Sequence, residues 1–130
     1  MAVSNRLRLL GLALGWGWAA AIVWLALMPS PPTIDIDQFD KVSHLLAYGI
    51  LMFWFCQLYA ARRTRLIYAL GFAALGVGLE LLQRELGFRT YEVFDMAANT
   101  LGVALGWAVA LAVGHRLVAW LTHRLPAGRR

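Results

Sequence analysis

The stretch DMAANTLGVALGWAVALAVG, residues 95–114, contains the two features on which the fold of this 130-residue chain depends. It is long and apolar enough for a helix that crosses the hydrocarbon core of a membrane, which takes about 20 residues at 1.5 Å of rise each. It also carries small residues at every fourth position, namely Ala98, Gly102, Gly106, Ala110 and Gly114. Because small residues let helix backbones approach closely, the stretch predicts a membrane-spanning helix that packs against a neighbour.

Three further apolar runs of spanning length precede this one. The predicted helices cover about residues 9–28, 42–61, 66–83 and 94–118. The first run ends before Pro29, Pro31 and Pro32, which cannot continue a helix. A cleaved signal peptide is the alternative for this run, but its length and its ending in Leu27-Met28 favour a retained anchor. We therefore predict an all-α fold, a polytopic membrane protein built as a four-transmembrane-helix bundle.

The composition agrees with this fold. Hydrophobic residues make up 61% of the chain and charged residues 15%, and the mean hydropathy is +0.63, which is far more apolar than a soluble domain of this size. The net charge of +5 sits in short arginine clusters between apolar runs, so we predict the lipid bilayer, and no nucleic acid, as a partner. Cys56 is the only cysteine, which excludes an internal disulfide. Residues 1–130 are expected to form one membrane domain.

The basic residues predict the orientation, because short cytoplasmic loops hold an excess of Lys and Arg. With the N-terminus inside, nine basic residues are cytoplasmic, namely Arg6, Arg8, Arg62, Arg63, Arg65, Arg116, Arg124, Arg129 and Arg130. Three lie outside, namely Lys41, Arg84 and Arg89. All seven acids then fall at outer loops or outer helix ends, namely Asp35, Asp37, Asp40, Glu80, Glu85, Glu92 and Asp95. We predict that both termini are cytoplasmic.

Polar side chains gather near the outer ends of three predicted helices. They stand at helical spacing, with Asp40, His44 and Tyr48 beside Lys41 on the second helix, Glu80 and Gln83 on the third, and Asp95 and Asn99 on the fourth. A charge within a span costs about 2.5–3.5 kcal/mol, so such residues point to a function. His44, Glu80 and Asn99 each lie about one turn below the outer boundary, so we expect a shared pocket. Arg89, in the loop before the fourth helix, is predicted at its rim.

These residues also resemble those of a known family. The similarity to the VanZ family rests on three motifs in the family's order and covers about residues 36–110: Asp40 to His44 with Tyr48, Gly76 to Glu80 with Gln83, and Arg89 ahead of Asp95 to Asn99 and Gly102. Members of that family are small bacterial membrane proteins, and the founding member confers resistance to the lipoglycopeptide antibiotic teicoplanin. The resemblance implies a multi-pass protein of the bacterial cytoplasmic (inner) membrane.

Three functional hypotheses stand beside a purely structural polar network. The first is binding of the head group of a lipid, a cell-wall precursor or a lipoglycopeptide. Its predicted binding residues are Asp40, Lys41, His44, Tyr48, Glu80, Gln83, Arg89, Asp95 and Asn99. Acids outnumber cations among them, so a site for phosphate alone is disfavoured.

The second hypothesis is a membrane-embedded enzyme that uses His44 with Glu80 or Asp95. Ser43 points about 100° away from His44 on the helix and so does not pair with it as a nucleophile. The third hypothesis is a metal site in which His44 with Glu80, Asp95 and Asp40 would bind zinc or manganese if the geometry closes. A single histidine is a thin basis for such a site, so we expect neither metal nor cofactor.

Self-association is a further expectation. The first helix carries Gly11 and Gly15, and the fourth carries the ridge of small residues described above. Either could serve as the contact of a homo-oligomer, because small residues favour helix association in lipid.

Overall fold

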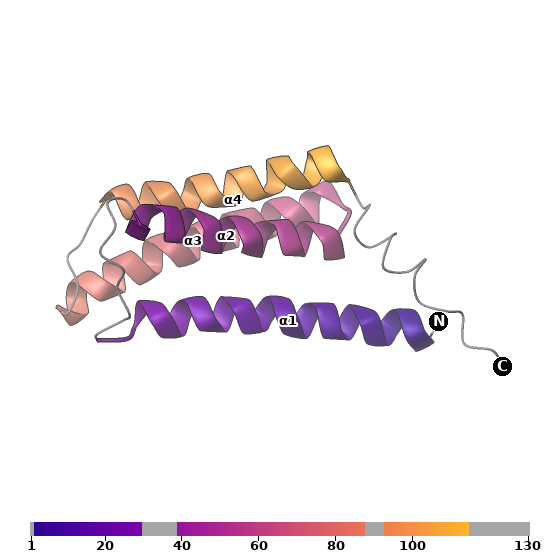
Figure 1. Cartoon of the computed structure of the whole chain (residues 1–130), viewed down its shortest axis with the longest axis horizontal. Coiled ribbons are helices and arrows are strands. Elements are labelled where there is room, and N and C mark those ends of the chain that lie inside the picture. The colour runs from indigo at the N-terminus through magenta and orange to yellow at the C-terminus, as the bar shows by residue number, and fades with distance from the viewer. Residues whose placement is uncertain (1, 30–38, 88–92, 115–130) are drawn as a thin grey trace.

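The computed structural model describes residues 2–29, 39–87 and 93–114 and folds them into four α-helices (Figure 1). These are α1 (Ala2–Ala26), α2 (Phe39–Leu58), α3 (Arg62–Leu86) and α4 (Val93–Val113). All four are long and apolar enough to cross a membrane, and the described residues form no strand. The predicted all-α, multi-pass membrane fold is therefore confirmed.

The helices differ from the predicted ranges at their ends. α1 and α3 begin earlier, at Ala2 and Arg62. A helix satisfies its backbone hydrogen bonds internally whatever its side chains are, so it continues beyond the last apolar residue into the head-group region. α2 ends earlier than predicted, at Leu58. The predicted part of the fourth helix beyond Gly114 lies outside the described residues.

The turn between α2 and α3 is closed by the side chain of Arg65. Its Nε donates to the carbonyl of Tyr59 and its Nη2 to the carbonyl of Cys56, both at 2.6 Å. The last carbonyls of a helix have no partner within that helix, so Arg65 supplies donors that would otherwise be missing in lipid. Arg65 is 7% exposed. It is thus a structural residue, whereas the sequence had indicated only a charge in a loop.

α2 and α4 run side by side in the same direction (Figure 1). Gly102 lies against the carbonyl of Leu45, and Gly106 lies against the carbonyl of Gly49. A Cβ at either glycine of α4 would overlap that oxygen. Ala110 continues the same face and is fully buried. The ridge predicted on the fourth helix is therefore the surface that holds α4 against α2.

α1 runs antiparallel to α2 and packs on it through its own two glycines. Gly11 faces Leu58, and Gly15 faces Trp54 and Phe55. The indole nitrogen of Trp54 also donates to the carbonyl of Gly11 at 2.8 Å. Both small-residue surfaces that the sequence offered for self-association are therefore used within the chain, so a homo-oligomer would have to form through other faces.

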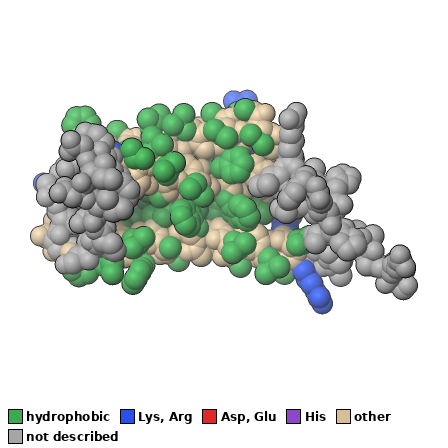
Figure 2. Space-filling model, in the orientation of Figure 1, with side chains coloured by type: hydrophobic (Ala, Val, Ile, Leu, Met, Phe, Trp, Pro, Cys, Tyr) green, Lys and Arg blue, Asp and Glu red, His purple; other side chains and the backbone are tan. Residues whose placement is uncertain are grey.

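The core lies along α2, while the outer surface is apolar. Leu51, Met52, Phe55 and Cys56 of α2 are at most 1% exposed. Large apolar side chains point outward from the other helices, among them Leu9, Leu14, Trp24, Ile67, Leu70, Phe94 and Leu111. Figure 2 shows such side chains across the middle of the bundle. Soluble monomers rarely expose so much contiguous apolar surface, which fits a lipid environment.

Candidate functional site

One end of the bundle, where α1 and α3 finish and α2 and α4 begin, brings polar side chains from three helices around His44. His44 Nδ1 donates a hydrogen bond to Asn99 Oδ1 at 2.9 Å and lies 3.9 Å from Glu80 Oε1. On the other side of the ring, His44 Nε2 lies 3.5 Å from Asp40 Oδ1. Asp95 joins the group, because ligand atoms of Asp40, His44 and Asp95 lie within 4.8 Å of one another. We call these five residues the His44 cluster.

The cluster confirms the predicted meeting of polar residues from α2, α3 and α4 at one depth. Asp40 and His44 are one turn apart and share a face of α2. Asp40 and Asp95 each lie in the first turn of their helix, where the helix dipole favours a negative charge. Parallel packing of α2 and α4 places these two first turns next to each other. What these residues do remains a prediction.

Gly76 of α3 makes the arrangement possible. A Cβ at this position would lie 2.9 Å from Cβ of Asn99 and 3.1 Å from its Nδ2. Any larger residue would push Asn99 away from α3 and out of line with His44. Gly76 falls in the second of the three motifs, yet sequence reasoning assigned it no role, because its contact is with a helix far along the chain.

Exposure falls steeply across the cluster. The side chain of Asp40 is 65% exposed, that of His44 18% and that of Glu80 4%. Asp95 and Asn99 are buried. The cluster is thus open at Asp40 and closed at Glu80, so a polar group from the membrane surface would meet Asp40 first and His44 next.

Not all of the remaining predicted site residues lie at the cluster. Tyr48 is buried one turn beyond His44 on the same face of α2, so it borders the cluster. Gln83 does not point its donor there, because its Nε2 donates to the carbonyl of Ala26 at 2.7 Å and ties α3 to the end of α1. Lys41 is half-buried at the start of α2. Arg89 lies outside the described residues.

Ser43 does not act as a partner of His44. Its hydroxyl donates to the carbonyl of Asp40 at 2.7 Å, within its own helix. This agrees with the predicted direction of its side chain, which left His44 without a serine nucleophile.

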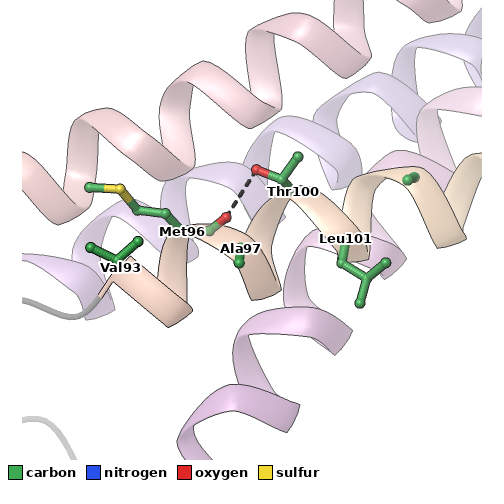
Figure 3. Close-up of a pocket in the computed structure, with 6 residues that line it drawn as sticks. Val93, Met96, Ala97, Thr100 and Leu101 are labelled. Atoms are coloured by element: carbon green, nitrogen blue, oxygen red, sulfur yellow. Dashed lines mark hydrogen bonds between the residues drawn. The ribbon is translucent and has the colours of Figure 1, made fainter.

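A shallow groove on α4 lies apart from the cluster (Figure 3). It is lined by Val93, Met96, Ala97, Thr100, Leu101 and Ala104. The one hydroxyl there, on Thr100, donates to the carbonyl of Met96 at 2.9 Å. Asp95 and Asn99 are buried on the face of α4 that packs inside the bundle. The groove is therefore an apolar, lipid-facing surface, and none of the predicted binding residues lines it.

The fold and the cluster define a multi-pass helical membrane protein with a buried polar group at one end. In a comparison with known proteins, the chain is similar to an uncharacterized protein of Schizosaccharomyces pombe, with 32% identity over 77 residues. The match covers 57% of this chain and 48% of that protein, so the chain spans about half the length of its relative. No known family profile matches the chain. No solved structure matches it significantly.

Proposed function

We propose that this chain is a VanZ-type protein of the bacterial cytoplasmic membrane, with both termini in the cytoplasm, whose His44 cluster binds the polar head group of an amphiphile in the outer leaflet. The amphiphile would be a lipid, a lipid-linked cell-wall precursor or a lipoglycopeptide. The nine-to-three distribution of basic residues supports this orientation, which places the cluster at the outer face.

The proposal rests chiefly on the convergence of Asp40, Glu80 and Asn99 within 3.9 Å of the ring nitrogens of His44. Interhelical hydrogen bonds in membranes contribute only about 0.6 kcal/mol on average, so polar contacts of this kind poorly offset the cost of two buried acids. Apolar packing would stabilise the same helix contact more cheaply. Ionisable groups retained inside a membrane therefore favour a role in binding.

The residues suit a head group rich in hydroxyl or amine donors. The carboxylates of Asp40, Glu80 and Asp95 accept hydrogen bonds, while the His44 ring can both donate and accept. Asp40 is the exposed member, so it is the first contact for a head group that descends from the surface. The acyl part of the same molecule would remain against the apolar exterior of the bundle.

Native mass spectrometry of the detergent-solubilised chain tests this proposal, because it identifies the amphiphile that co-purifies. We expect one bound amphiphile in the native protein and at least a tenfold loss of occupancy in Asp40→Asn, which removes a charge at an exposed position. Glu85→Gln is the matched control, since Glu85 is an exposed acid at the same end of α3 and outside the cluster. Equal occupancy in all three proteins would refute the proposal.

The same variants separate binding from the two alternatives. A membrane-embedded enzyme using His44 with Glu80 or Asp95 would convert the co-purified amphiphile, and a product peak would appear over time. A purely structural network would lower the free energy of unfolding in Asp40→Asn without changing occupancy. Occupancy lost without a product and without unfolding is the result that binding predicts.

The orientation needs a separate measurement. Cys56 is buried, so single-cysteine variants can be built on the native background by adding one exposed cysteine. With a maleimide that cannot cross membranes, whole cells should label Asp40→Cys and leave Arg62→Cys unlabelled until they are permeabilised. The reverse pattern would overturn the predicted orientation.

A further inference from the structure

Three residues of the His44 cluster come together in the manner of a metal site. One ligand atom each from Asp40, His44 and Asp95 lies within 4.8 Å of the other two. A tetrahedral zinc ion with bonds of about 2.0–2.1 Å keeps its ligands about 3.3 Å apart. His44 Nε2 and Asp40 Oδ1, at 3.5 Å, already have nearly that separation. Asp95 offers the third ligand atom, an oxygen within 4.8 Å of the ligand atoms of His44 and Asp40.

The hydrogen bond on the far side of the His44 ring points to the same conclusion. Asn99 Oδ1 is an acceptor, so His44 Nδ1 carries the hydrogen of the 2.9 Å contact. In the neutral ring, Nε2 then holds a lone pair and faces the carboxylate of Asp40, which is also an acceptor. Two acceptors at this distance repel each other unless a proton or a metal cation lies between them. Histidines that bind metals are typically held in this way, with the other ring nitrogen donating to an oxygen.

The two helices that supply the three residues are held at a fixed spacing. Asp40 and His44 come from α2 and Asp95 from α4, and the contacts of Gly102 and Gly106 with α2 backbone carbonyls hold these two helices close together. The cluster is therefore preorganised rather than assembled from loops. Preorganised ligands lose little entropy when they bind an ion.

We infer that Asp40, His44 and Asp95 bind one divalent transition-metal cation, with Zn²⁺ or Mn²⁺ the best match to one imidazole nitrogen and two carboxylates. The inference deepens the proposed function and rests on it in one respect: the coordination position left open at the exposed side of Asp40 would take an oxygen of the head group. The cation would also neutralise two of the acids that otherwise repel an anionic head group.

The test uses the full chain, purified in detergent without a polyhistidine tag and treated with a chelator, then titrated with Zn²⁺ and separately with Mn²⁺. We expect one ion per chain and at least a tenfold weaker affinity in Asp40→Asn. Glu85→Gln should bind as the native protein does. Circular dichroism checks that Asp40→Asn remains helical, and the exposure of Asp40 makes unfolding unexpected.

X-ray absorption at the zinc edge provides an independent readout, with nitrogen and oxygen ligands expected at about 2.0–2.1 Å and no sulfur. Absence of saturable binding, equal affinity in Asp40→Asn, or a sulfur ligand would each overturn the inference. If the chelated protein still binds the amphiphile and no metal titrates into it, the proposed function stands while the metal inference fails. A protein that binds the metal but no amphiphile would support the metal inference while the proposed function fails.

Discussion

Replacing Gly76 with alanine should displace Asn99 and so disturb the His44 cluster, although Gly76 is not itself a member of the cluster. The new methyl group would lie 2.9 Å from Cβ of Asn99, whereas carbon atoms in ordinary contact are about 3.5–4.0 Å apart. Overpacking of this size typically costs about 1–3 kcal/mol. Displacement of Asn99 would also break its hydrogen bond to His44, worth about 0.6 kcal/mol in a membrane. We expect the free energy of unfolding of Gly76→Ala to fall by about 2–3 kcal/mol.

Gly78→Ala is the matched control for this experiment, because no atom lies within 4 Å of the position its Cβ would take. Its stability should be unchanged or higher by up to about 1 kcal/mol, since alanine is the better helix former. Reversible unfolding in bicelles by steric trapping measures both variants under the same conditions. If Gly76→Ala is as stable as Gly78→Ala, then Asn99 does not lie beneath α3 and the geometry of the cluster is wrong.

Three further substitutions test the supports of the site. Arg65→Met removes two 2.6 Å hydrogen bonds to the end of α2 and should lower the free energy of unfolding by about 2–3 kcal/mol; exposed Arg62→Met should change it by less than about 0.5 kcal/mol. Gly106→Val should separate α2 from α4 at a cost of about 3 kcal/mol, while Gly71→Val, with open space around it, should not. Gln83→Leu should speed amide hydrogen exchange in the last turn of α1, measured in nanodiscs, and an unchanged rate would show that this tie is unimportant.

Much of the fold follows from the sequence because a membrane restricts the choices. Runs of about 20 apolar residues indicate spanning helices, so the number of helices was predictable from composition and length. Ends of helices were less predictable, because hydropathy reports the apolar part of a helix and not its full length. α2 ends where Arg65 reaches back to its carbonyls, and that contact depends on a turn the sequence does not specify.

The cluster itself was predictable in part. Helical spacing gave the faces on which Asp40, His44, Glu80 and Asn99 lie, and counting residues gave their common depth. It was harder to predict which helices are neighbours, because residue spacing along one helix does not say which other helix packs against it. For that reason Gln83 was placed in the site although its donor binds α1.

The close pairing of α2 with α4 shows the same limit. Small residues on the fourth helix predicted a packed face but did not identify α2 as its partner. Only the parallel contact of the two helices brings Asp95 beside Asp40 and His44. The sequence offered Asp40, His44, Glu80 and Asp95 as possible metal ligands, but it could not show that Asp40, His44 and Asp95 lie close enough to share one ion.

The most direct test of the central claim is to follow the ring nitrogens of His44 by ¹⁵N NMR in nanodiscs while the co-purified amphiphile is added back. If the His44 cluster receives the head group, the His44 signals shift and saturate in the native protein and in Glu85→Gln, but not in Asp40→Asn. His115 and His123, which follow α4 in the sequence, provide internal reference signals. Saturable binding of the amphiphile with no change at His44 would contradict the account.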